Sequence, residues 1–302
     1  MLLPKCKSLI DFSKDFGSKE QCLHYLIQEK WGEGFECRKC NHNVSVKGKK
    51  WHYKRCQKCG YDESATANTL FHKIKFPLVN AFWIVHQIST LKKGLSTCEL
   101  ARQYSICQKT AWFFKRKVQE AIDSQDPELL EDNVEVDEFV IGGAEAGKPG
   151  RSHGKKAKIL VAVEIAYPES KKGPIIKRAA ARVISSYSAE ELKRGINEMI
   201  DIESLVVTDG WPAYAKATDG RDHQVFLSDH GKNFPLLHFH IFNLKNWIRG
   251  IHHSVSHDHL QRYLNEYHYR FNRRKYRASC PMGILRRMVK APWLPHKSAV
   301  AN

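Results

Sequence analysis

The stretch from Val134 to Gly143 constrains the fold of this chain more than any other. It combines β-branched and aromatic residues and ends in two glycines, which is typical of a β-strand. Apolar residues occupy both alternating sets of positions, so we expect a strand that is buried on both faces within a sheet. Glu135 and Asp137 share one face of it. Carboxylates at such positions are costly to bury unless a cation lies beside them.

These residues alone leave two interpretations of the acids open. They are solvated at the strand ends or paired with basic side chains, or they belong to a catalytic site. Structural ion pairs are commoner than catalytic carboxylates, so the rest of the chain has to decide.

The charge balance narrows the classes of partner. The 302 residues include 49 Lys and Arg against 32 Asp and Glu, a formal net charge of +17. This excess favours a polyanion, and nucleic acid is the first candidate. Because no run approaches the roughly 18 apolar residues of a spanning helix and the N-terminal stretch lacks a signal-peptide core, we expect no membrane partner and a cytoplasmic location.

Two cysteine doublets predict a metal site. Fifteen residues separate Cys37-x2-Cys40 from Cys56-x2-Cys59, which is the spacing of zinc sites. Four cysteines leave no open coordination position, so one structural Zn²⁺ is expected, held by a small ribbon with a hairpin. The alternative is four free thiols.

The next segment predicts a pair of short helices. Ser96 to Glu99 reads as a capping box that starts a first helix, Ser105 is a turn, and a second helix runs from Lys109 to Lys117. The pair resembles a helix-turn-helix, and small helical pairs that only pack together look the same. The DNA-contact candidates here are Lys109, Lys115, Arg116 and Lys117.

The second half of the chain predicts an α/β order. Strands are expected at 134–143, 159–165, 175–184, 205–210 and 224–227, a helix follows Ser188, and two more helices begin near Pro235 and Ser256. A Gly-rich basic loop at 147–156 connects the first two strands. Asp209 ends a strand, where ligand sites of open sheets lie.

The last two predicted helices contribute further candidate residues. His238 and Lys245 are seven residues apart and therefore nearly share a helix face. The run at 270–277 interleaves basic and aromatic residues, which favours phosphate contact over a merely solvated face. Its DNA-contact candidates are Arg270, Arg273, Arg274, Lys275 and Arg277.

These motifs together resemble one family. The cysteine ribbon, V-D-E-x-x-x-G-G, T-D-G, His238-x4-Asn243-Leu244-Lys245-x-Trp247, Tyr263-Leu264-Asn265-Glu266 and Arg270-Phe271-Asn272-Arg273-Arg274 occur in this order between residues 20 and 277. The chain thereby resembles insertion-sequence transposases of the ISXO-like group, which have an N-terminal zinc ribbon and a DDE-type, RNase H-like catalytic domain.

The resemblance implies a catalytic set. Asp137 and Asp209 match the first two acids, and two Mg²⁺ or Mn²⁺ ions are expected as cofactors. The third position, usually Glu, holds His238, with Lys245 seven residues on. Glu266 competes for that role because Arg273 lies seven residues after it, although Arg270 at i+4 suggests a helix-surface ion pair. Glu135 is a further alternative.

The expected architecture is multi-domain, combining α+β and α/β parts. It comprises an N-terminal helix and zinc ribbon at 1–70, a helix-turn-helix-like unit at 71–125, an RNase H-like mixed-sheet catalytic domain with C-terminal helices at 126–277, and a tail at 278–302. The expected function is that of a DNA transposase that binds terminal repeats, cleaves and transfers strands, and forms a homo-oligomer on DNA in the nucleoid. The alternative is a non-catalytic zinc-ribbon DNA-binding protein, either a regulator or an inactivated transposase.

Overall fold

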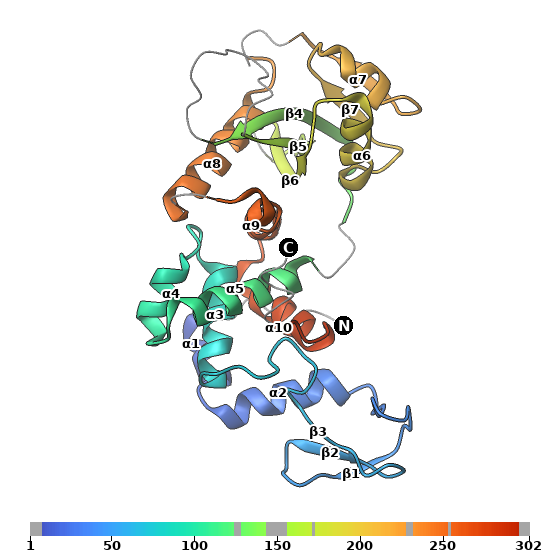
Figure 1. Ribbon diagram of the computed structural model, residues 1–302. Coiled ribbons are helices and arrows are strands. Elements are labelled where there is room, and N and C mark those ends of the chain that lie inside the picture. Colours follow the sequence, from blue (N-terminus) through green and yellow to red (C-terminus); the bar gives the residue numbers. More distant parts are fainter. Residues whose placement is uncertain are drawn as a thin grey trace. The chain divides into compact units, whose positions relative to one another are not determined.

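The computed structural model describes residues 8–123, 128–142, 156–170, 173–227, 232–252 and 255–295. The chain forms two compact units (Figure 1). The first comprises Met1–Ser124 together with Lys275–Asn302, and the second comprises Gln125–Arg274. Among the described residues, no helix has the length and apolar character needed to cross a membrane.

The first unit begins with two short helices and a small sheet. Helices α1 (Leu9–Asp15) and α2 (Lys19–Trp31) both open with capping boxes, and Ser18 caps α2 as its sequence predicts. The strands β1 (Ser45–Lys47), β2 (Tyr53–Cys56) and β3 (Asp62–Ser64) form an antiparallel sheet in chain order. This is the predicted ribbon, with one strand more than a hairpin.

Three helices follow in the same unit: α3 (Leu78–Thr90), α4 (Thr97–Tyr104) and α5 (Gln108–Asp123). Ser96 caps α4, and Ser105 ends it with a left-handed φ of 51°, so the predicted helix pair is present. Helix α5 continues well beyond Lys117, where the sequence suggested its end. Val118, Ala121 and Ile122 prolong its buried apolar stripe.

The C-terminal segment, expected to be a tail, forms a helix of the first unit. A 3₁₀ turn (Arg277–Ser279) leads into α10 (Cys280–Lys290), which packs against α2, α3 and α5. Ile284, Leu285 and Met288 are fully buried there. Their spacing is that of one helix face, and burial against three helices holds the segment in place.

The second unit is built on a mixed five-stranded sheet. Its strands are β4 (Asn133–Ile141), β5 (Ala157–Ala166), β6 (Ile175–Ile184), β7 (Leu205–Thr208) and β8 (His223–Val225), in the spatial order β6-β5-β4-β7-β8. The first three strands pair antiparallel, and β7 and β8 add in parallel. The predicted strands are all present, although of the Gly-rich loop at 147–156 only Lys156 lies within the described residues.

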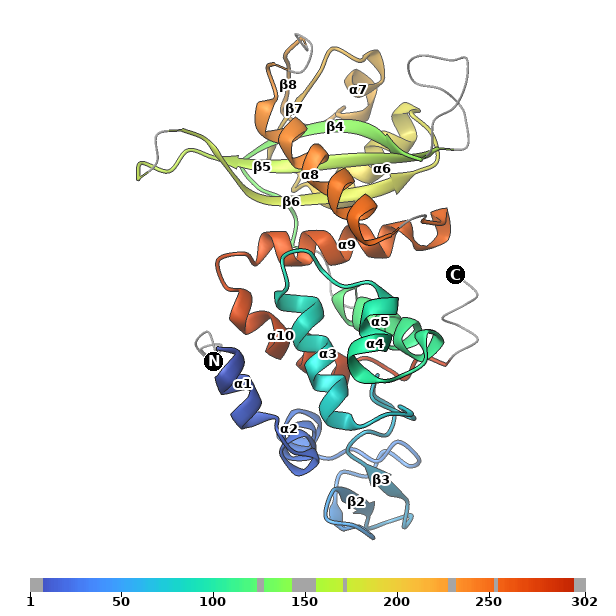
Figure 2. The same cartoon turned by 90° about the vertical axis from the view of Figure 1, so that its left-hand side faces the viewer.

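Helices cover both faces of this sheet. Helices α8 (Pro235–Ile251) and α9 (His257–Asn272) pack on one face, and α6 (Ala189–Met199) and α7 (Pro212–Ala217) pack on the other. Figure 2 shows α8 crossing in front of the strands with α6 behind them. The short helix α7 replaces a predicted turn after Trp211. This arrangement confirms the expected RNase H-like fold, with β4 at the centre of the sheet.

Candidate active site

The register of the central strands brings two acids together. Strands β4 and β7 run parallel, and Glu135 lies opposite Val207. Asp137 lies two residues further along β4, and Asp209 directly follows the last residue of β7, Thr208, so the two acids lie at the same end of this strand pair. Both carboxylates also contribute to raising the pKa of the Tyr214 phenol, after burial and the nearby Glu138. Two acids distant in sequence are therefore both near Tyr214, at the carboxyl end of β7 and beside the central strand β4.

Backbone groups orient each of these carboxylates. One oxygen of Asp137, Oδ1, accepts a hydrogen bond of 2.8 Å from the amide of Glu138. Asp209 Oδ1 accepts one of 3.1 Å from the amide of Trp211, in the turn that leaves β7. Local hydrogen bonds of this kind restrict the rotamers of both carboxylates.

A buried tyrosine supports the turn that carries Asp209. Tyr214, on α7, is fully buried, and its hydroxyl donates a hydrogen bond to Glu138 Oε2 on β4. This bond ties the segment after β7 to the strand that bears Asp137. The sequence analysis did not single out this pair. The W-P-A-Y turn directly after Asp209 is the only sign of it in the sequence.

Helix α8 adds a histidine and a lysine. His238 Nδ1 lies 4.0 Å from Asp137 Oδ2. Burial lowers the pKa of His238, and the nearby ammonium of Lys245 lowers it further, so the imidazole is neutral at pH 7. The Lys245 Nζ lies 5.1 Å from the centre of the Phe139 ring on β4. Burial and Arg249 lower the pKa of Lys245, whereas Asp137 raises it. The structure thus gathers Asp137, His238 and Lys245, as the seven-residue spacing on α8 predicts.

Glu135 lies on the same face of β4 as Asp137. Burial raises its pKa to about 7, and its Oε2 is buried with no hydrogen-bond partner among the described residues. An unsatisfied buried carboxylate oxygen costs free energy unless a proton or a cation accompanies it. Glu135 therefore remains a candidate for the site.

The donor set suits a hard divalent cation. Carboxylate oxygens with one imidazole are ligands that Mg²⁺ and Mn²⁺ accept. Within the described part of the chain, however, only the four cysteines bring three or more ligand atoms within 4.8 Å of one another. The acids and His238 are spaced more widely. Ligands spread over two ions about 3.5–4 Å apart need not all converge on one point, so this wider spacing is compatible with two ions.

Glu266 is placed elsewhere. It is fully buried on α9, and its Oε1 lies 2.7 Å from Arg270 Nη1. The predicted i+4 ion pair is present, but it is buried and not on the helix surface. Helix α9 packs mainly against β6, two strands away from β4.

The four cysteines of the ribbon form a compact cluster. The Sγ atoms of Cys37 and Cys59 are 3.6 Å apart, as are those of Cys40 and Cys56. A tetrahedral Zn²⁺ with Zn–S bonds of about 2.3 Å requires sulfur separations of about 3.8 Å. The cluster therefore has the geometry of a zinc ribbon, as the doublet spacing predicts.

The candidate DNA contacts on α5 differ in exposure. Lys109 is exposed in the first turn. Lys115 and Lys117 are buried, and their ammonium groups donate hydrogen bonds of 2.8 Å and 3.0 Å to the carbonyls of Leu95 and His72. Arg116 is also buried and lies 5.6 Å from the ring centre of Trp112. Of these four side chains, only Lys109 is exposed to solvent.

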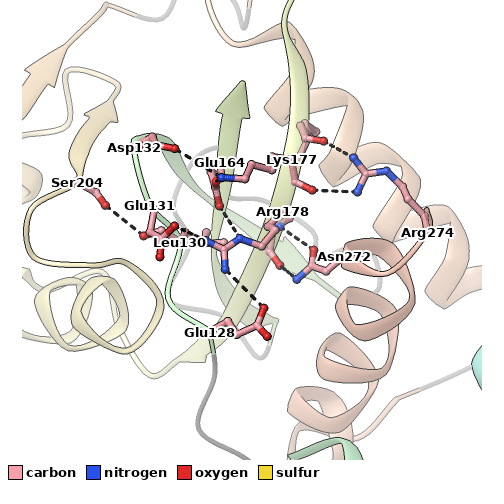
Figure 3. Close-up of polar contacts among 12 residues, drawn as sticks. Glu128, Leu130, Glu131, Asp132, Glu164, Lys177, Arg178, Ser204, Asn272 and Arg274 are labelled. Carbon is pink, nitrogen blue, oxygen red and sulfur yellow. Dashed lines mark hydrogen bonds and ion pairs between the residues drawn. The ribbon is translucent and has the colours of Figure 1, made fainter. Parts of the chain in front are cut away.

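The basic run after α9 is likewise divided. Arg274 donates hydrogen bonds to the carbonyls of Ile176 and Lys177 on β6 (Figure 3). Arg273 stacks its guanidinium 4.2 Å from the centre of the Tyr269 ring. Arg270 pairs with Glu266, Lys275 is exposed, and Arg277 is partly buried. Part of this run thus holds the fold of its own unit.

The second unit matches a known domain family. Residues 129–272, from before β4 to the end of α9, match the model of the ISXO2-like transposase domain. No curated protein matches the chain. The matched range contains the sheet, both aspartates, His238 and Lys245. With its RNase H-like sheet and the cysteine ribbon before it, the chain carries an ISXO2-like DDE transposase domain preceded by a segment with zinc-ribbon geometry.

Proposed function

We propose that the protein is a DNA transposase that cleaves element ends and joins them to target DNA at Asp137, Asp209 and His238. The observation that carries the proposal is that Asp137 of β4 and Asp209 at the end of the parallel strand β7 both lie near Tyr214, with His238 Nδ1 at 4.0 Å from Asp137 Oδ2, inside an ISXO2-like transposase domain.

The proposed roles follow from position. Asp137, between the other two, would contact both Mg²⁺ or Mn²⁺ ions, Asp209 one of them and neutral His238 the other. When bound, such ions activate an attacking oxygen and stabilise a leaving oxygen. Lys245 lies seven residues after His238 on nearly the same face of α8. It holds a phosphate of the strand being cut. Glu135, two residues before Asp137 on β4, supports the site and is the alternative ligand.

DNA binding is assigned to the first unit, which includes exposed Lys275, and to partly exposed Arg273. The ribbon, the α4–α5 pair and Lys109 would contact the element ends, and Lys275 and Arg273 would add phosphate contacts. Because two element ends have to be joined, we expect at least two copies of the chain on the DNA during the reaction.

Removing a single acid tests the proposal. Purified protein is incubated with end-sequence DNA and Mn²⁺, and nicking and strand transfer are followed on gels. Asp137→Asn and Asp209→Asn should lower both rates by about 10³-fold or more, since a ligand of the cations is lost, while DNA binding persists. The control Asp258→Asn, exposed at the start of α9, should cut normally. Binding without cleavage in the unaltered protein would favour the rival, a non-catalytic DNA-binding protein.

The third ligand is tested separately. His238→Ala should abolish strand transfer, and His238→Glu should retain some and shift the preference from Mn²⁺ toward Mg²⁺, because a carboxylate is a harder ligand than imidazole. Glu266→Gln should cut DNA at a rate near that of the unaltered protein, although it is less stable after losing a buried partner of Arg270. If Glu266→Gln is inactive and His238→Ala cuts normally, Glu266 is the third ligand and His238 is not.

A further inference from the structure

A cavity in the first unit is lined by residues that the proposed reaction does not use. It encloses about 500 Å³ and lies between the segment that precedes α3, the first turns of α5 and the segment that follows α10. This volume is within the range of sites for small ligands and cofactors. Its charged and aromatic lining residues include Lys73, Lys75, Lys109, Phe113, Lys117 and Trp293.

Two aromatic rings of the lining each have an ammonium group beside them. Lys73 Nζ lies 5.1 Å from the centre of the Trp293 ring, and Lys117 Nζ lies 5.1 Å from that of Phe113. His72 meets Trp293 edge to face, with ring centres 5.2 Å apart, which fixes the orientation of the indole. Trp293 is 37% exposed, so part of its surface is accessible from solvent.

The cavity is electropositive. Its lining residues include four lysines and no Asp or Glu. The N-terminal end of the 16-residue helix α5 adds its positive dipole, next to exposed Lys109. Burial lowers the pKa of Lys117 to about 8, and its ammonium donates to the His72 carbonyl at 3.0 Å. An anion in the cavity would compensate this desolvated charge.

We propose that this cavity binds an unpaired nucleotide of single-stranded DNA, with the base against Trp293 and Phe113 and the phosphate among the lysines. Aromatic rings together with ammonium groups are what single-stranded nucleic acid requires, since every base offers a face for stacking and every nucleotide offers one phosphate. A base inside a duplex has both faces covered by its neighbours, so only an unpaired nucleotide can enter. The inference rests on the proposed function in that DNA is the ligand.

The test compares two fluorescent DNAs on the full-length, zinc-loaded protein. One is a blunt duplex, and the other is the same duplex with a single-stranded extension of thymidines. The unaltered protein should bind the extended DNA more tightly. Trp293→Ala should weaken binding of the extended DNA by about 5- to 150-fold, the range for loss of one stacked base, and leave binding of the blunt duplex unchanged. Trp293→Phe should retain most of the affinity, because a smaller ring still stacks.

Matched controls distinguish an effect on the cavity from a general effect of removing positive charge or an aromatic ring. Tyr167→Ala removes an exposed aromatic residue of the other unit and should change neither affinity. The double variant Lys73→Gln and Lys75→Gln should weaken binding of the extended DNA. The effect should be larger than that of the control double variant Lys92→Gln and Lys93→Gln, which changes two exposed lysines. The first double variant tests the cavity through exposed residues, so it remains informative if Trp293→Ala fails to fold.

Three results would overturn the inference. Equal binding of blunt and extended DNA by the unaltered protein, or equal weakening of both DNAs in Trp293→Ala, would contradict it while leaving the transposase proposal intact. Equal effects of the two lysine pairs would do the same. Failure to bind either DNA would contradict the inference and the proposed function together.

Discussion

At the scale of single residues, two buried histidines join the helices that cover the site face of the sheet. His240 on α8 and His268 on α9 are almost fully buried, with their Nε2 atoms 3.1 Å apart. His268 Nδ1 lies 2.7 Å from the carbonyl of Leu264, and an N–H there donates to it. The Nε2 of His268 then accepts a hydrogen bond from His240, and both rings are neutral.

This arrangement predicts acid sensitivity. Burial lowers the pKa of His268 from its ordinary value of 6.5 to about 4; the hydrogen bond to the Leu264 carbonyl opposes this shift, and the charge of Arg182 adds to it. Between pH 6.5 and 4 the unfolded chain binds a proton at this position that the folded chain does not, so the free energy of unfolding falls as the pH falls through that window. When the pH is lowered from 7.5 to 4.5, the free energy of unfolding should fall by about 2–3 kcal/mol less in His268→Phe than in the unaltered protein. Urea unfolding at the two pH values measures this difference.

The control for this prediction is His257→Phe, an exposed histidine at the start of α9. It should show the same loss of stability as the unaltered protein over that pH range. An equally steep loss in His268→Phe would mean that other groups cause the acid sensitivity.

At the scale of elements, helix α9 closes the free edge of strand β6. The side-chain amide of Asn272 accepts from the Ala179 N–H at 2.9 Å and donates to its carbonyl at 3.0 Å. About three turns earlier, the side-chain amide of Gln261 accepts from the Val183 N–H at 2.8 Å and donates to the Ala181 carbonyl at 2.9 Å. Side-chain amides thereby replace a neighbouring strand, and an edge satisfied in this way is not available for pairing with another chain.

Charged residues anchor the other end of the same strand. Figure 3 shows Arg178 and Lys177 of β6 around Glu164 of β5, with Asn272 at the end of α9 and Arg274 just after it beside them. Glu164 is fully buried, and its two oxygens lie 2.6 Å from Lys177 Nζ and 2.7 Å from Arg178 Nε. Two cations compensate the buried carboxylate, so β5 and β6 are tied at both their backbones and their side chains.

We therefore predict that Asn272 is a stability residue. Asn272→Ala leaves the amide and the carbonyl of Ala179 without their partners and should lower the free energy of unfolding by about 2 kcal/mol or more. Asn246→Ala, at an exposed position on α8, should change it by less than about 0.5 kcal/mol. Both are measured by urea unfolding. Equal stability of the two variants, with weaker DNA binding only in Asn272→Ala, would instead make Asn272 a DNA contact.

At the scale of the whole molecule, the chain makes two compact units, and its two ends contribute to the same one. Residues 275–302 are grouped with residues 1–124, and α10 buries its apolar face against α2, α3 and α5. The ribbon within that unit has three strands of three or four residues. Elements this short have little core of their own, so a bound metal has to supply much of their stability.

Metal removal should therefore act on one unit. We predict one zinc per chain by elemental analysis, and its loss in Cys37→Ser. Chelation should expose the ribbon to protease within residues 37–59 while the second unit keeps its thermal transition, because that unit has its own sheet and two apolar layers. Cys98→Ser, an exposed cysteine outside the cluster, is the control and should keep its zinc. Protein purified under reducing conditions without zinc would contradict the assignment.

Local spacing predicts much of this protein. The alternation of apolar residues in 134–143, the cysteine doublets and the helix caps depend on contacts within a few residues, so the strands, the cysteine cluster and most helices follow from sequence. The pairing of His238 with Lys245 also follows, since helix geometry places residues seven apart on nearly one face.

Other features depend on which elements pack together. Basic residues at 115–117 and 270–274 read as DNA contacts in sequence, yet several of them are buried or bonded to backbone carbonyls of their own unit. The elements packed around a lysine decide whether its ammonium group contacts solvent or a carbonyl. The spacing of residues in the sequence does not show which elements these are. The same holds for Glu266, for α10, and for the placement of Asp137 and Asp209 at the same end of a strand pair, which the parallel register of β4 and β7 creates.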